Sequence, residues 1–301
     1  MEMNGDWDKI DAVQRMQDYI LAHFREEIAL RDLAKAAAYS PWQALRAFHQ
    51  LTGKTPFAYI RDVRLTDAAM ALRDTGKSVL DVALDAAFGS HEGFTKAFSR
   101  RFGLPPERYR REAPPIPLFT YYSVRGYHKY LEGGNVPMQT SVVFTQVIER
   151  PARKVILKRG FKATDYFEYC GEVGCDIWGV LISVKGALYE SVGLWLPEKL
   201  RVPGTSEYCQ GVEVPCDYEG PVPEGYDLID LAPCKYMVFQ GEPYDDERFE
   251  EAITAVWDAI DRFDPRRFGW EWAAEDAPRF QLEPRGERGY IEGRPVRPFM
   301  G

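Results

Sequence analysis

Two short segments, about fifty residues apart, each bring polar, cationic or aromatic side chains together within five or six residues. Amide, guanidinium and ammonium groups can hydrogen-bond to base edges in the major groove of DNA. The two sets are Trp42, Gln43, Leu45 and Arg46, and His91, Glu92, Thr95 and Lys96. Reading bases requires a helix that presents such residues near its N-terminal end, so the surrounding sequence must supply that helix twice.

The sequence around both sets is an internal repeat. The stretch LAKAAAYSPWQALRAFHQLTGKTPFAYIR over residues 33–61 corresponds to VALDAAFGSHEGFTKAFSRRFGLPPERYRR over residues 82–111, with Gly89 as one extra residue. Each copy has an apolar helix, a short turn and a second helix that follows Ser40 or Ser90, both good N-caps. The pattern predicts two helix-turn-helix units, although two duplicated hairpins in a plain helical bundle would have a similar pattern.

This double motif resembles the DNA-binding domain of the AraC/XylS family of bacterial transcription regulators. The resemblance covers residues 8–112, and its most specific part is the end of the second copy, with a glycine, a proline pair and a tyrosine-arginine. It implies an all-α, homeodomain-like double helix-turn-helix domain over residues 7–112. It also implies a double-stranded DNA operator as partner, RNA polymerase as a further partner, and base contacts from the two sets above.

A long helix is expected between the two units. Its apolar stripe predicts a helix over residues 57–73, Gly76 ends it, and Ser78 with Asp81 begins the second unit as N-cap and first-turn acid. If this helix holds the two reading helices about 34 Å apart, one chain can enter two successive major grooves. That geometry is implied by the resemblance.

The net charge of −8 looks unsuited to DNA binding until it is divided along the chain. Residues 1–112 contain 17 Lys and Arg against 16 Asp and Glu, whereas the remainder contains 21 against 30. Such asymmetry indicates separate roles for the two parts. Six basic residues of the second copy, with Glu107 as their only opposition, favour phosphate contacts or form an ordinary solvated helix end: Lys96, Arg100, Arg101, Arg108, Arg110 and Arg111.

The chain changes character after residue 112. The prolines of APPIP over 113–117 forbid a continuing helix, and we expect residues 113–138 to be a linker with some docking aromatic residues. Over residues 139–298 the pattern predicts an α+β domain, in which strand, strand, helix, strand is followed by strand, helix, strand, strand. The expected strands are 141–149, 154–159, 208–214, 236–240, 280–282 and 290–296, and the expected helices are 164–189 and 245–263.

This order, with the fragments GVEV, YMVFQGEPYDD and RGYIEGRPV, resembles the GyrI-like effector-binding domain. The resemblance implies two related halves around a groove for small aromatic or cationic molecules. Glu292 best matches the acid that the family supplies from its last strand, and Arg294 beside it can neutralise it. The residues expected to bind ligand are Trp178, Tyr208, Glu213, Trp270, Trp272, Tyr290 and Glu292, whereas Trp257, on the apolar stripe of a helix, is assigned to the core.

The sequence favours a ligand-responsive, cytoplasmic transcription regulator. Two alternatives stay open: a hydrolase that opens a small strained ring in the same groove, and a constitutive DNA-binding protein without a ligand. No nucleophile elbow, phosphate-binding loop, dinucleotide fingerprint or metal-ligand spacing is present, so we expect no enzyme activity, no cofactor and no metal. No apolar run is long enough to span a membrane, and no membrane partner is expected.

Overall fold

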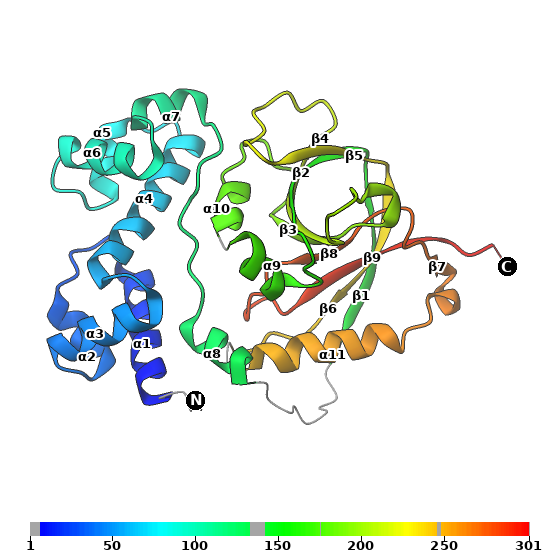
Figure 1. Ribbon diagram of the computed structural model, residues 1–301, viewed down its shortest axis with the longest axis horizontal. Helices are drawn as coiled ribbons and strands as arrows, with labels where there is room; N and C mark the ends of the chain where they lie inside the picture. Colours follow the sequence, from blue (N-terminus) through cyan, green and yellow to red (C-terminus); the bar gives the residue numbers. More distant parts are fainter. Residues whose placement is uncertain (1–6, 133–141, 175, 246–247, 301) are drawn as a thin grey trace. The chain divides into compact units, whose positions relative to one another are not determined.

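The structure is a computed structural model that describes residues 7–132, 142–174, 176–245 and 248–300. The expected loose tail over residues 1–6 and most of the flexible stretch over 131–137 lie outside these residues. The chain divides into two compact units, Met1–Gly134 and Asn135–Gly301 (Figure 1), which are described separately.

The first unit is helical. Its helices are α1(Trp7–His23), α2(Leu30–Ala37), α3(Pro41–Thr52), α4(Pro56–Asp74), α5(Val79–Asp85), α6(His91–Phe102), α7(Pro106–Glu112) and α8(Val124–Glu132). Helices α2 and α3 form the first predicted helix-turn-helix, and α5 and α6 form the second. The turn of each enters a left-handed conformation at Ala38 or Ala87, with φ of 55° and 53°, so the two turns repeat in geometry as well as in sequence.

Helix α4 joins the two helix-turn-helix units, as its apolar stripe predicts. Its buried residues include Ile60, Val63, Leu65, Ala68, Ala69 and Leu72. The first helix-turn-helix packs around Phe48, whose ring makes an edge contact with Tyr59 of α4, and the second helix-turn-helix packs around Phe94 and Phe98. Because one helix contributes to both cores, it fixes the separation of the two units.

The segment after α7 lies against the helical unit. Ile116 and Leu118 are buried, and the ring of Phe119 makes an edge contact with Tyr59 of α4. Helix α8 then contacts α1. The segment that was predicted to be a linker is therefore, as far as residue 132, an extension of the helical unit, and we call residues 113–132 the strap; residues 133–138 lie outside the described part of the chain.

The second unit is built on one antiparallel sheet. Its strands are β1(Phe144–Arg150), β2(Arg153–Arg159), β3(Val192–Trp195), β4(Tyr208–Pro215), β5(Asp227–Leu231), β6(Cys234–Gln240), β7(Trp270–Trp272), β8(Arg279–Leu282) and β9(Ile291–Pro298). Its helices are α9(Tyr166–Val173), α10(Asp176–Ile182) and α11(Phe249–Asp261), with short 3-10 turns at η1(Glu198–Leu200) and η3(Pro265–Phe268). Figure 1 shows α9 and α10 beside the strongly curved β2–β5 end of the sheet, and α11 along its other end.

The strand order exposes an internal duplication. The order is β1-β6-β9-β8-β3-β4-β2-β5, with β7 paired to β9. The sequence β2, α9–α10, β3, β4 matches β6, α11, β8, β9, and the two sets meet at β3 and β8. Each leading strand is exchanged: β1 precedes β2 but pairs with β6, and β5 precedes β6 but pairs with β2. The predicted α+β order with two related halves is thus present as a topology.

Two strands and one helix break were not predicted. Strand β3 contains Gly193 and is only four residues long, and β5 is charged and partly exposed, so neither has a clear hydrophobic alternation. The helix expected over 164–189 is two helices, because Gly174 adopts a φ of 102° that a residue with a side chain rarely takes. The structure describes no helix that is long and apolar enough to cross a membrane.

Candidate DNA-reading helices and the Glu292 cluster

The first candidate reading helix, α3, begins as the sequence predicts. The Oγ atom of Ser40 accepts a hydrogen bond from the Gln43 amide, and the Gln43 side-chain oxygen accepts one from the Ser40 amide at 3.1 Å. This reciprocal cap uses the oxygen of the Gln43 amide group, which leaves its NH₂ as the group for an outside acceptor. The cap therefore orders the first turn of α3 and does not use the NH₂ donors of Gln43.

The predicted reading residues of α3 differ in exposure. Trp42 is 66% exposed, Gln43 and Arg46 are also exposed, and Leu45 is half-buried beside the buried Ala44. The guanidinium carbon of Arg46 lies 5.4 Å from the centre of the Trp42 ring. The Trp42 ring thus lies against the Arg46 guanidinium on the exposed face of the helix.

The second candidate, α6, has a different chemistry. Ser90 caps it through a hydrogen bond from the Gly93 amide at 3.1 Å. His91, Glu92 and Lys96 are exposed, and the Lys96 ammonium lies 2.8 Å from the Glu92 carboxylate. Because this pair spans one helical turn in water, it is worth only about 0.3–0.5 kcal/mol and can open for an outside anion.

Thr95 is the fourth predicted residue of α6. It is half-buried, and its Oγ1 atom is buried without a hydrogen-bond partner among the described residues. Its position is one turn from His91 on the same side of the helix. Thr95 therefore lies at the edge of the outer face, next to the core residue Phe94.

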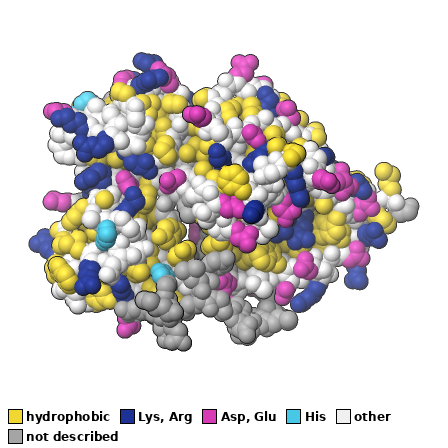
Figure 2. Space-filling model, in the orientation of Figure 1, with side chains coloured by type: hydrophobic (Ala, Val, Ile, Leu, Met, Phe, Trp, Pro, Cys, Tyr) yellow, Lys and Arg dark blue, Asp and Glu magenta, His cyan; other side chains and the backbone are white. Residues whose placement is uncertain are grey.

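The basic cluster predicted around α6 and α7 is less charged than its sequence indicated. Arg101 lies 3.8 Å from Asp62 of α4, Arg110 pairs with Glu107, and both Arg108 and Arg111 pair with Glu112. Figure 2 shows Lys and Arg side chains interspersed with Asp and Glu over the helical unit. The count of one opposing acid was wrong, since it missed the partners that helical spacing and α4 bring near.

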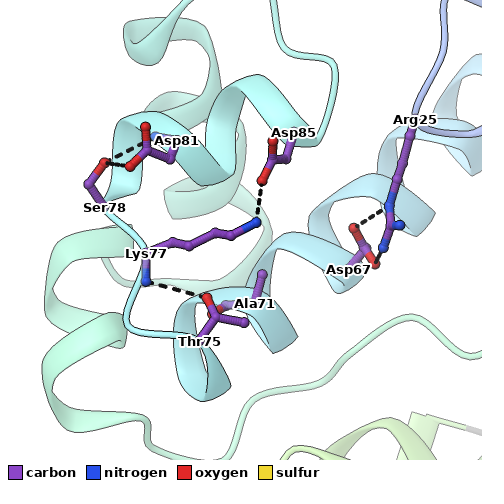
Figure 3. Close-up of polar contacts among 8 residues, drawn as sticks. All are labelled: Arg25, Asp67, Ala71, Thr75, Lys77, Ser78, Asp81 and Asp85. Carbon is purple, nitrogen blue, oxygen red and sulfur yellow. Dashed lines mark hydrogen bonds and ion pairs between the residues drawn. The ribbon is translucent and has the colours of Figure 1, made fainter.

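Polar contacts fix the start of α5, the first helix of the second helix-turn-helix. Ser78 caps α5, because the Asp81 amide donates to its Oγ atom at 3.1 Å, and the Lys77 ammonium lies 2.8 Å from Asp85 (Figure 3). On the other side of this region Arg25 pairs with Asp67 of α4 at 2.7 Å (Figure 3). The predicted helix end at Gly76 and the predicted cap at Ser78 are both confirmed.

Arg64 of α4 links the two helix-turn-helix units directly. Its guanidinium donates to the carbonyls of Phe24 and Glu26, each at 2.6 Å, and to that of Ala87 at 3.3 Å. The first two carbonyls precede α2, and the third lies in the turn between α5 and α6. The Arg64 side chain thus fixes the turn of the second helix-turn-helix against the segment that precedes the first helix-turn-helix.

In the sheet unit, over Asn135–Gly301, one row of directly opposite residues crosses the sheet. Directly opposite residues of neighbouring antiparallel strands share a face. The row runs from β6 through β9, β8 and β3 to β4 as Phe239, Glu292, Gln281, Gly193 and Gln210. Phe239 packs with α11 at one end, and Val212, two residues from Gln210, packs with α10 at the other. Glu292 therefore lies between the helices that cover this face.

Glu292 is fully buried and accepts four side-chain hydrogen bonds. Its Oε2 atom accepts from the Trp257 indole at 3.0 Å, from the Tyr290 hydroxyl at 3.1 Å and from Arg279 at 2.7 Å, and its Oε1 atom accepts from Arg294 at 2.9 Å. We call these five residues the Glu292 cluster. The expected neutralisation of Glu292 by Arg294 is confirmed, and Arg279 adds a second cation.

Three members of the Glu292 cluster remain open to solvent. The Arg279 and Arg294 side chains are 28% and 26% exposed, and Trp257 is 39% exposed. The assignment of Trp257 to the core was wrong, because its helix turns the indole N–H toward Glu292. The cluster thus has a buried carboxylate beneath a partly exposed layer of two guanidiniums and an indole.

Glu213, the second predicted acid, lies on the opposite face of the sheet. It stands one residue out of step with Gln210 and Val212, beside Val155 of β2. Its side chain is 1% exposed and pairs with Arg150 and with Arg153, the latter at 2.9 Å. Burial by itself would lower the pKa of Arg153, but the charge of Glu213 raises it above its ordinary value. This face does not contain the Glu292 cluster.

The predicted aromatic residues divide in the same way. Tyr208 is buried two residues from Gln210 on the face of the Glu292 cluster, and Trp178 is a half-buried residue of α10. Trp272 contacts the rings of Phe239 and Phe263, and Trp270 belongs to the same apolar cluster under α11. Of the aromatic residues predicted to bind ligand, Tyr290 alone is bonded to Glu292 in the described structure.

Comparison with known proteins bears on the helical unit. The sequence profile of a helix-turn-helix domain family matches residues 33–112. The regulatory protein SoxS of Escherichia coli strain K12 is 34% identical over 98 residues, which are 33% of this chain and 92% of SoxS. The chain belongs to the AraC family.

Further relatives share the same part of this AraC-family chain. The transcriptional regulator Rob of Salmonella typhimurium is 36% identical over 106 residues, which are 35% of this chain and 37% of Rob. The match therefore spans about a third of the length of that relative. Among solved structures, the DNA-binding domain of AdpA in complex with a target DNA is 29% identical and covers 34% of this chain and 91% of that chain, with a TM-score of 0.33.

Several residues that surround Glu292 were not predicted from the sequence of this AraC-family protein. Arg279 lies with its guanidinium carbon 4.0 Å from the centre of the Trp195 ring, and Trp195 also contacts the ring of Tyr208. Gln210 and Gln281 are buried on either side of Gly193. A buried-strand pattern interrupted by two glutamines and an arginine was the available signal, but the strand β3 that joins them was not recognised.

Proposed function

We propose that this AraC-family chain is a sequence-specific DNA-binding transcription regulator that reads DNA with α3 and α6. The observation that carries the proposal is the matched exposure of Arg46 and Lys96, each on the outer face of a capped helix one turn from its start. The reading surface would comprise the eight residues predicted from the sequence. The identity to SoxS over this unit supports the same assignment.

The length of α4 supports contact with two successive major grooves. Its 19 residues make a helix about 28 Å long, close to the 34 Å between successive grooves. Helices α3 and α5 contact α4, and Arg64 fixes the second helix-turn-helix against the first. A single chain would then present two reading helices without the need for a dimer.

The test uses DNA sites selected by the wild-type protein from a random double-stranded library. Arg46→Ala and Lys96→Ala should each weaken binding to the selected site about five- to a hundredfold and leave binding to a scrambled site nearly unchanged, because one good base contact is worth about 1–3 kcal/mol. Arg262→Ala, which removes an exposed arginine of the other unit, is the matched control. Equal losses on both DNAs would indicate phosphate contacts, and unchanged affinity in both variants would contradict the assignment.

We further propose that the unit over 139–298 is a GyrI-like domain that binds a small aromatic effector at the Glu292 cluster. The duplicated topology supports the resemblance, and the partly exposed layer over a buried, fully bonded carboxylate supports a binding role. Of the predicted ligand residues, we retain Tyr208 and Tyr290 at this site, with Glu292 as its buried acid. RNA polymerase remains a proposed further partner, for which no surface is assigned.

Tryptophan fluorescence of the full chain, titrated with a panel of aromatic cations, anions and neutral compounds, tests the effector. Saturable quenching without turnover, with altered affinity for the selected DNA site, is the expected result. Product formation would favour the hydrolase alternative. Silence across the panel, with intact DNA binding, would favour a constitutive DNA-binding protein.

A further inference from the structure

The carboxylate of Glu292 has no acceptor capacity left for a ligand. An ionised carboxylate offers about four lone-pair positions, and Glu292 already accepts from four side chains at 2.7 to 3.1 Å. A cationic ligand would have to displace Arg279 or Arg294 to reach it. The formal charges of Glu292 and its two arginines also sum to +1, which opposes the approach of a second cation.

Beside the Glu292 cluster, three buried hydrogen-bond donors are left unpaired in the described structure. Tyr208 Oη, Gln210 Nε2 and Arg279 Nε are buried and lack a hydrogen-bond partner within the part of the chain that the structure describes. Burial raises the pKa of the Tyr208 hydroxyl well above its ordinary value, so it stays protonated and can donate. Buried donors of this kind are costly when unpaired, and an acceptor from a ligand would satisfy them.

The strand register places these donors together. Arg279 faces Trp195 on β3, and Trp195 faces Tyr208 on β4, so the three form one cross-strand row. The next row on the same face contains Gln210, Gly193 and Gln281. A side chain at Gly193 would overlap Tyr208 Oη, so the glycine allows that hydroxyl to lie over the middle of the sheet.

Aromatic rings border the donors. The Trp195 ring carries the Arg279 guanidinium on one side and contacts the Tyr208 ring with centroids 4.9 Å apart. Trp257 borders Glu292 from α11. An aromatic ligand with one acidic group would thus find rings for its body and donors for its charge.

From these contacts we infer that the Glu292 cluster recognises the anionic group, a carboxylate or its equivalent, of an aromatic ligand. The inference rests on the proposed effector-binding role and reverses the charge preference that the sequence resemblance implied. Arg279 and Arg294 form the charge-assisted hydrogen bonds, with Tyr208 and Gln210 as neutral donors. Glu292 positions the two arginines and does not contact the ligand.

Isothermal titration of the full chain with three probes of one shape tests this inference: 2-naphthoate, 2-naphthamide and 2-naphthylmethylammonium. We expect 2-naphthoate to bind at least tenfold more tightly than the ammonium probe, with the amide between them. The affinity of 2-naphthoate should fall as ionic strength rises. Arg294→Gln should weaken 2-naphthoate at least tenfold and leave the amide within threefold, because only the charged contact is lost.

A matched control and a second variant protect the result from misfolding. Arg297→Gln removes an arginine of the same strand that pairs with Glu271 and Glu275 in solvent, and it should leave all three affinities unchanged. Arg279→Lys keeps the charge but loses the planar guanidinium, and it should retain preference for 2-naphthoate with reduced affinity. Circular dichroism at the titration temperature checks that each variant is folded.

The outcomes separate the inference from the function on which it rests. Tighter binding of the ammonium probe would overturn the anion preference while supporting a ligand site. If no probe binds and the panel of aromatic compounds is also silent, the effector role fails and the inference fails with it. If the probes bind equally well to wild type and to Arg294→Gln, the ligand does not contact the Glu292 cluster, and the inference is also refuted.

Discussion

Replacement of Glu213 by glutamine should destabilise the sheet unit more than the same replacement of Glu292 or Glu271. Arg153 is 0% exposed and Arg150 is 6% exposed, so the change leaves two buried guanidiniums without a counter-charge. Removing one partner of a buried ion pair costs about 3–5 kcal/mol. The rings of Tyr189 and Phe280, whose centres lie 4.2 and 4.5 Å from the Arg150 guanidinium, partly compensate. We therefore expect about 3 kcal/mol.

Thermal unfolding followed by tryptophan fluorescence is the assay, because five of the seven tryptophans lie in the sheet unit. For a unit of this size, 1 kcal/mol shifts the midpoint by about 2–4 °C, so Glu213→Gln should lower it by about 6–12 °C. Glu292→Gln should cost less, because water reaches Arg279 and Arg294. The control Glu271→Gln breaks an exposed pair with Arg297 and should cost no more than about 1 kcal/mol.

Two results would refute this reasoning. A loss below about 1 kcal/mol for Glu213→Gln would mean that the buried arginines find other partners or water, and that the ion pairs do not hold this face together. A tenfold change in the affinity of an effector, measured where the variant is fully folded, would place Glu213 in the ligand site after all. We expect that affinity to stay within twofold, because Glu213 and Glu292 lie on opposite faces.

Two further predictions concern the helical unit. Burial raises the pKa of the Tyr109 hydroxyl to about 12, so this group loses its proton in the unfolded state first. The free energy of unfolding should therefore fall between pH 10 and about pH 12, by up to about 1.4 kcal/mol per pH unit. Tyr109→Phe should remove that part of the pH dependence and change little at pH 7, and an unchanged dependence on pH in urea unfolding would contradict this. The Gln17 side chain donates to the Tyr59 hydroxyl and the Tyr122 carbonyl and accepts from the Val124 amide. Gln17→Ala should therefore lower the free energy of unfolding by about 2–4 kcal/mol and speed hydrogen exchange at the Val124 amide. Protection of that amide as in the wild type would show that the strap does not depend on Gln17.

The sequence alone determined the helical unit in considerable detail. Caps, turn residues and apolar spacing act within a few residues of one another, so Ser40, Ser78 and Ser90 begin helices where expected and Gly76 ends one. The repeat also indicated which residues of α3 and α6 face outward. In the sheet unit, the order of the longer strands and the pairing of Glu292 with Arg294 followed from local pattern and register.

Only the tertiary structure decided which distant residues meet. Whether Glu213 and Glu292 share a face depends on how strands far apart in the chain align, and a shift of one residue reverses the face. Strand β3, short and glycine-containing, gave no pattern of its own, yet it brings Arg279 and Tyr208 to either side of Trp195. Helices α3 and α6 were predictable because short-range forces define them. The contacts of Glu292 with Arg279 and Trp257 were not predictable, because only long-range pairing brings those residues to it.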